Sequence, residues 1–117
     1  MPKLVTYQVP ALDKKSGKVV TLEKRGYVAN LYVGNVQEKF VLQLGIDGLP
    51  ELLVHYATGQ KFGDTLNSVK VRNMLAYGSQ HHTPDRKAAE QIIAEIIARV
   101  GIDKVRSVMR SAPIINA

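Results

Sequence analysis

The sequence predicts an α+β protein in which an N-terminal antiparallel β-meander, of about four to six strands, is packed on one face by three C-terminal helices. Two observations predict this order. β-Branched and aromatic residues alternate with polar ones over the first half of the chain, as in half-buried strands. Apolar residues recur at helical spacing over the second half. The 117 residues contain no internal repeat, linker or low-complexity tract, so we expect one domain over residues 1–117.

The first strand is expected over residues 4–9, because apolar and polar residues alternate there and Pro10 follows. A loop with a lysine-rich tip leads to a second strand, residues 18–24. We expect Arg25-Gly26 to turn the chain into a third strand, residues 27–33.

Gly34-Asn35 then favours a hairpin into a fourth strand, residues 36–44, because such turns need positive φ angles. This register places Ala29 opposite Phe40, and a turn at Arg25-Gly26 would place Leu22 opposite Ala29. Both hairpins therefore bury the same face of the third strand. The expected inner face consists of Val20, Leu22, Tyr27, Ala29, Leu31, Val33, Val36, Phe40 and Leu42, with Glu38 at its rim.

Residues 46–63 allow two interpretations, since residues 50–58 read either as a helix starting at Pro50 or as a strand. In the strand interpretation, a turn at Thr58-Gly59 brings Leu53, His55 and Phe62 beside the inner face. We favour the strand, because the Val-His-Tyr run at residues 54–56 prefers extended structure.

The first helix is expected from a cap at Asp64 or Thr65 to about Tyr77, with Gly78 closing it. The last helix is expected over residues 104–111, opened by Asp103 and ended by Pro113. Residues 114–117 form a short apolar tail, which either packs back on the body or reaches a partner.

The middle helix has the clearest boundaries. Thr83 is expected to cap it, Pro84 suits its first turn, and Gly101 suits its end. Glu95 and Arg99 are spaced for an ion pair. The apolar stripe of this helix, which we expect to cover Phe40 and Leu42, consists of Ile92, Ile93, Ile96, Ile97 and Val100.

The composition restricts the classes of function that the protein can have. The net charge is +6, and the two halves contribute equally, since residues 1–63 and residues 64–117 each hold eight basic and five acidic side chains (8 − 5 = +3). The chain has no cysteine, which excludes disulfides and thiolate chemistry. No apolar run has the length of a signal peptide or a membrane span, so we expect a cytoplasmic protein with no membrane partner.

The sequence carries no motif for catalysis or for a cofactor. It lacks a Gly-x-Ser-x-Gly element, a phosphate-binding glycine loop and a metal-binding histidine spacing. We therefore expect no enzyme, no cofactor and no metal. The remaining alternative is a hydrolase or metal-dependent enzyme that uses His81, His82 and Asp85, which metal analysis of the purified protein would test.

Nucleic-acid binding through phosphate contacts is the function that the basic charge favours. Two basic groups, the loop lysines and Lys24-Arg25, lie at opposite ends of the second strand, roughly 20 Å apart at strand rise. One phosphate run cannot contact both unless it crosses the sheet. The candidate contacts, with Tyr32 as a stacking platform, are Lys14, Lys15, Lys18, Tyr32, Lys39, Lys70, Arg72, Arg106 and Arg110.

The alternative function is a protein-interaction or inhibitor module, which we expect to form a homodimer. Apolar residues also fall on the outer face of the predicted sheet, and a sheet that is apolar on both faces needs a second cover. The candidate interaction face consists of Val28, Val41, Val54 and Tyr56.

Overall fold

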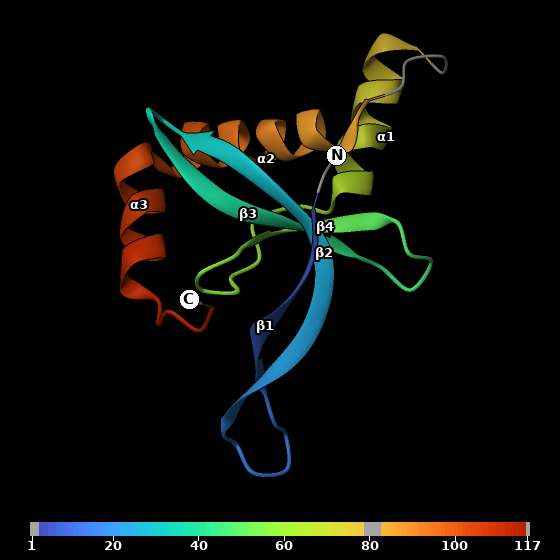
Figure 1. The fold of residues 1–117 in the computed structure, drawn as a ribbon. Coiled ribbons are helices and arrows are strands. Elements are labelled where there is room, and N and C mark those ends of the chain that lie inside the picture. The colour runs from blue at the N-terminus through green and yellow to red at the C-terminus, as the bar shows by residue number, and fades with distance from the viewer. Residues whose placement is uncertain (1–2, 79–82, 117) are drawn as a thin grey trace.

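A computed structural model describes residues 3–78 and 83–116. A four-stranded antiparallel sheet precedes three helices, so the predicted α+β arrangement is confirmed (Figure 1). The strands lie in the order β1-β2-β3-β4. The strand bounds are Leu4–Leu12 (β1), Val19–Val33 (β2), Val36–Leu44 (β3) and Pro50–His55 (β4). The helix bounds are Leu66–Tyr77 (α1), Asp85–Val100 (α2) and Ile102–Ser111 (α3).

The hairpin between β2 and β3 has the predicted register. Val33 pairs with Val36, Ala29 pairs with Phe40, and Tyr27 pairs with Leu42. Gly34 adopts a φ of 67°, which a two-residue hairpin turn requires. The sequence identified this hairpin correctly because its turn and its apolar alternation agree.

The predicted turn at Arg25-Gly26 is wrong. Both residues lie inside β2, a continuous strand of 15 residues whose first half pairs with β1 and whose second half pairs with β3. Gly26 is needed for another reason. A Cβ atom there would collide with the Val41 side chain and lie 2.5 Å from the Leu42 carbonyl oxygen. The glycine thus marks a close approach of two strands rather than a reversal of the chain.

This difference moves two residues out of the core. Val20 and Leu22 were expected to face Leu31 and Ala29, but they pair with Ala11 and Val9 of β1 and are exposed. Val36, beside the β2–β3 turn, is also exposed.

The first strand is longer than predicted, because β1 continues through Pro10 to Leu12. It is an edge strand, and an edge tolerates a residue that has no N–H group to donate.

The strand interpretation of residues 50–58 is confirmed. β4 places Leu53 opposite Leu42 and His55 opposite Phe40. The chain then turns, and Lys61 forms an isolated bridge back to Val54. Phe62 packs edge-on against Phe40, with ring centroids 5.3 Å apart.

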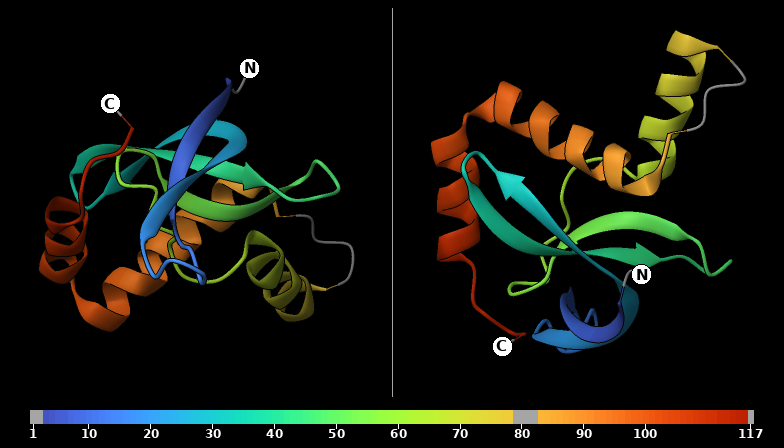
Figure 2. Two further views of the ribbon diagram at one scale, coloured as in Figure 1. Left: turned by 90° about the horizontal axis from the view of Figure 1, so that it is seen from below. Right: turned by 45° about the horizontal axis from the view of Figure 1, so that its top comes forward.

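The isoleucine face of α2 covers the sheet as predicted. Ile92 and Ile93 are buried in one cluster with Phe40 and Leu42, and Ile96 and Ile97 pack at its margin. Burial of a large aliphatic side chain contributes about 1.5–3 kcal/mol, so this contact is a main source of stability. Figures 1 and 2 show α2 lying across the sheet, with α1 and α3 flanking its two ends.

A second, smaller cluster fills the other face of the sheet. It is formed by Tyr7 of β1 with Val41 and Val54, and these two valines are 0% and 2% exposed. The prediction of an exposed interaction face is therefore wrong for Val41 and Val54. Val28 and Tyr56 are half-buried. The same chain supplies the cover, because the long β2 carries β1 over this face.

The helix ends match the sequence in most respects. The Oγ1 atom of Thr65 accepts a hydrogen bond from the Ser68 N–H group at 3.1 Å, and α1 ends at Gly78. Gly101 closes α2 with a φ of 90°.

Two details of α2 differ from the prediction. Pro84 occupies the cap position with no side-chain cap, and the buried Thr83 accepts a long contact from Asn73 at 3.4 Å instead. Glu95 pairs with Arg72 of α1 at 2.9 Å rather than with Arg99, because the tertiary fold offers it a closer cation.

The C-terminal tail packs back on the body. The backbone N–H groups of Ile115 and Asn116 both donate to the Ala57 carbonyl oxygen, at 2.8 and 3.0 Å. Within residues 3–78 and 83–116, no helix is both long and apolar enough to cross a bilayer.

Candidate functional site

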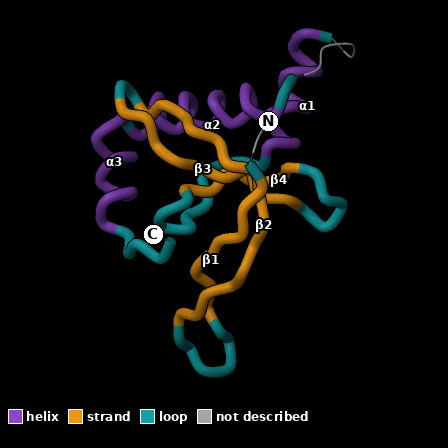
Figure 3. Tube along the Cα trace, in the orientation of Figure 1, coloured by secondary structure: helices purple, strands orange, loops and turns teal. Residues whose placement is uncertain are grey.

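The end of the β1–β2 hairpin, residues 11–20, projects from the body of the protein and is called the arm here (Figures 1 and 3). The sequence builds its tip around Asp13. The Asp13 carboxylate accepts hydrogen bonds from the Lys15 N–H group at 3.1 Å and the Ser16 hydroxyl at 2.9 Å. These bonds, led by that from Ser16, hold the pKa of Asp13 below its ordinary value.

The arm therefore presents an ordered turn with three exposed lysines. Lys14, Lys15 and Lys18 all lie in this turn, and the only carboxylate in the arm, that of Asp13, is engaged by the turn itself. Three ammonium groups on a short loop create a local positive field that attracts phosphate.

The arm also carries apolar residues that the body does not cover. Leu12 and Val19 are cross-strand partners beside the turn, and they are 67% and 72% exposed. The exposed residues Val20 and Leu22 continue this surface toward the body. Apolar residues of this size on a projecting hairpin are typical of a contact surface.

Two of the predicted phosphate contacts are engaged by carboxylates instead. The Lys70 Nζ atom lies 3.1 Å from Asp85. Arg72 pairs with Asp64 at 2.8 Å and with Glu95 at 2.9 Å. The Asp64 hydrogen bond is the main cause that raises the pKa of Arg72. Both side chains thus join helices within the protein.

The predicted stacking platform is only partly present. Tyr32 of β2 is 64% exposed, so its ring is available to a base. Lys39 lies over the ring of Tyr56, with its Nζ atom 3.8 Å from the ring centroid, which is a cation–π contact.

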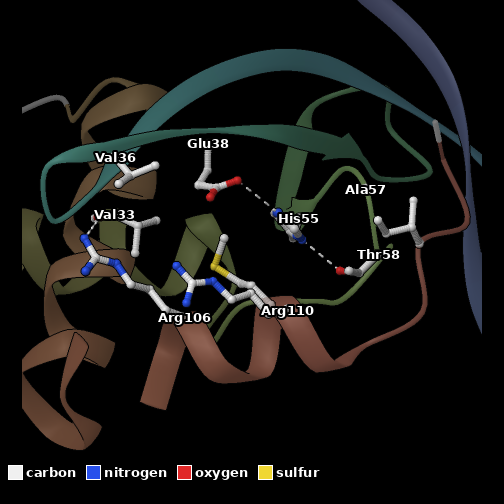
Figure 4. A pocket seen from close by; sticks show the side chains of 10 residues that line it. Val33, Val36, Glu38, His55, Ala57, Thr58, Arg106 and Arg110 are labelled. Atoms are coloured by element: carbon white, nitrogen blue, oxygen red, sulfur yellow. Dashed lines mark hydrogen bonds and ion pairs between the residues drawn. The ribbon is translucent and has the colours of Figure 1, made fainter. Parts of the chain in front are cut away.

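Arg106 and Arg110 line a pocket of about 340 Å³ between α3, the β2–β3 hairpin and the turn after β4. Figure 4 shows both arginines on α3, extending toward the strand that carries Glu38. The Arg106 Nη2 atom donates to the Asn35 Oδ1 atom at 2.9 Å and to the Val33 carbonyl oxygen at 3.3 Å. These contacts fix the Arg106 side chain against the hairpin turn.

Neither arginine is paired with a carboxylate in the described part of the chain. Arginine has five N–H donors, and Arg106 uses two of them in the contacts above, which leaves three. Arg110 has no hydrogen-bond partner among residues 3–78 and 83–116, which leaves five. The pocket wall therefore carries two positive charges and about eight free donors.

His55 forms the inner end of the pocket. Its Nδ1 atom lies 2.8 Å from the Thr58 Oγ1 atom, and its Nε2 atom lies 3.6 Å from the Glu38 carboxylate (Figure 4). Burial lowers the pKa of His55, and the nearby Glu38 only partly opposes this effect. The ring is therefore neutral at pH 7.

The pocket gathers residues that sequence reasoning did not combine. The strand register correctly placed Glu38 on the inner face and His55 beside Phe40. Their proximity to Arg106 and Arg110 was missed, because it depends on where α3 docks, and no local pattern encodes that position.

No metal centre is assembled in the described residues. No group of three or more metal-ligating side chains occurs in residues 3–78 and 83–116. His81 and His82, named for the metal alternative, lie outside these ranges, and Asp85 pairs with Lys70. Thr58 is 2% exposed, and its hydroxyl accepts the Gln60 N–H group, as in a turn that the side chain stabilises.

No protein-family model, no curated protein and no solved structure matches this chain.

Proposed function

We propose that this protein is a small, non-enzymatic nucleic-acid-binding protein that contacts the phosphate backbone through the lysine-tipped arm. The observation that supports this proposal is the arm itself. Lys14, Lys15 and Lys18 extend on an ordered turn and form no ion pair with a carboxylate of the described residues, so the turn keeps a net positive charge beside the ionised Asp13. The proposal includes the cytoplasmic location expected from the sequence.

The geometry of the arm suits this role. A two-stranded ribbon is narrow enough to enter the major groove of DNA, and ammonium groups release counterions when they meet phosphates. The exposed Leu12 and Val19 stand directly behind the lysines. Apolar side chains on such an element can contact base edges or wedge between base steps.

Fluorescence anisotropy of labelled 20-nucleotide single and double strands, titrated over a series of salt concentrations, tests the proposal. The variant carries Lys14→Gln, Lys15→Gln and Lys18→Gln. Three lost phosphate contacts should reduce the slope of log K against log salt by about 2–3 units, since each contact contributes about 0.7–0.9.

The matched control carries Lys61→Gln, Lys87→Gln and Lys104→Gln, three exposed lysines outside the arm. It changes the net charge by the same amount. The proposal is overturned if both variants weaken binding equally, or if the wild-type affinity does not depend on salt.

A second candidate function is association with a second copy of the chain or with a protein partner. The exposed Leu12–Val19 pair favours it, because this apolar surface replaces the covered Val41–Val54 surface as the site for a partner. Sedimentation velocity of the wild type and of Val19→Glu tests this function. A monomeric wild type, or a variant that associates equally well, contradicts association with a second copy of the chain.

A further inference from the structure

We infer that the pocket between α3 and the β2–β3 hairpin binds a nucleoside monophosphate unit, either free or at the end of a nucleic-acid strand. The pocket is distinct from the arm, so this inference goes beyond the proposed function. Its volume of about 340 Å³ falls at the lower end of the range of small-molecule sites, about 300–1,000 Å³.

The two arginines indicate the anionic part of the ligand. Guanidinium groups bind phosphate through pairs of parallel hydrogen bonds, and both groups here keep free N–H donors. Arg106 is already held by Asn35 and Val33, so its ordering has no further entropic cost when a ligand binds. Arg110, with no partner in the described residues, completes the pair one helical turn away.

Glu38 lies on β3, across the pocket from α3, and indicates a hydrogen-bond donor on the ligand. Its side chain is 35% exposed, and its carboxylate lies 3.6 Å from the Nε2 atom of the buried His55, whose pKa is lowered by burial. A carboxylate in this position repels a second anion and accepts N–H groups, such as those of guanine, adenine or cytosine.

The walls indicate that the ligand also has an apolar part. Val36 and Ile114 are exposed at the pocket, and Met109 lines it from α3. Inorganic phosphate would leave these side chains in water, whereas a sugar and base would cover them. An anion, a flat body and an amino-bearing edge together describe a nucleoside monophosphate.

Isothermal titration calorimetry of the full chain with GMP, UMP and inorganic phosphate tests the inference. GMP should bind at least tenfold more tightly than inorganic phosphate, and also more tightly than UMP, which lacks an exocyclic amino group. Equal affinity for GMP and inorganic phosphate would show a simple anion site and overturn the inference.

Variants locate the binding. Arg110→Gln should weaken GMP binding at least tenfold, whereas Arg99→Gln, an exposed arginine of α2 outside this pocket, should not. Glu38→Gln should reduce the preference for GMP over UMP. If Arg110→Gln and Arg99→Gln behave alike, the pocket is not the binding site.

Oligonucleotides with and without a terminal phosphate distinguish the two sources of the ligand. In the arm variant of Lys14, Lys15 and Lys18, tighter binding of the phosphorylated strand than of the same strand without the phosphate assigns the pocket to strand ends, and equal binding of the two strands assigns it to free nucleotide. The arm variant of Lys14, Lys15 and Lys18 should retain wild-type GMP affinity. Because the arm and the pocket are tested with different variants, the experiments can contradict nucleic-acid binding by the arm without contradicting nucleotide binding by the pocket, and the reverse.

Discussion

The side chain of Asn116 pairs with the backbone of Gln8, although 108 residues separate them in sequence. The Asn116 Oδ1 atom accepts from the Gln8 N–H group, and the Asn116 Nδ2 atom donates to the Gln8 carbonyl oxygen, both at 2.8 Å. The same Nδ2 atom donates to the Tyr56 carbonyl oxygen at 2.7 Å. One amide thus imitates a strand partner on the free edge of β1 and ties three segments together.

Replacement of Asn116 by Ala should destabilise the protein by about 1–3 kcal/mol, because it leaves the Gln8 backbone groups without their partner. Chemical denaturation with urea measures the change. Ile114→Ala, in the same tail at an exposed position, should change the free energy of unfolding by less than about 0.5 kcal/mol. Equal effects of the two variants would show that the amide contacts do not stabilise the tail.

Gly26→Ala should destabilise the protein by about 1–3 kcal/mol or more, because its Cβ atom would collide with the Val41 side chain and the Leu42 backbone. Thermal unfolding followed by circular dichroism measures this effect. The exposed neighbour Arg25→Ala serves as the control.

Adding Val41→Ala to Gly26→Ala tests the cause of that loss. The second change removes one of the two clashing groups, so the double variant should lose less stability than the two single changes added together. A Gly26→Ala protein of wild-type stability would contradict the close approach of β2 and β3.

On an uncovered interaction face, Val41→Glu would abolish partner binding and leave the fold intact, but the structure predicts that this change unfolds the protein. Val41 is fully buried under β1, and an unpaired carboxylate there should cost more than about 3 kcal/mol. Val19→Glu makes the same chemical change at an exposed position and should leave the fold intact. Circular dichroism of both variants measures whether each one is folded. A folded Val41→Glu protein would contradict the burial of Val41.

Acidification should destabilise the protein through His55. Its pKa is lowered in the folded state by burial, so the unfolded chain binds the proton more tightly. The stabilisation from the neutral ring is complete above about pH 6.5, the ordinary histidine pKa, and is lost as the pH falls toward the lower folded value.

His55→Asn, whose amide can keep the contact with Thr58, should flatten this dependence. Urea midpoints measured from pH 7.5 down to about pH 5 check the prediction, and the slope below about pH 6.5 should be larger in the wild type than in the variant. Identical slopes would show that His55 does not titrate in this range.

The sequence by itself determined the order of strands and helices, the β2–β3 register and the isoleucine face of α2, and it favoured a strand over a helix for β4. Each of these features follows from residues close together in the chain. There, the residues that favour a turn and the spacing of the apolar residues predict the same local structure. The arm lysines were also identified in this way, because a charged loop between two strands has nowhere to be buried.

Tertiary structure alone decided the rest. Arg25-Gly26 has the composition of a turn, yet pairing with β1 on one side and β3 on the other makes it the middle of a long strand. Val41 alternates as an outward residue, and only the path of β1 covers it. Arg106 and Arg110 meet Glu38 and His55 because α3 docks on the hairpin turn. Such contacts join residues far apart in sequence. The free energy of each contact depends on how distant segments pack together, which cannot be predicted from the spacing of neighbouring residues.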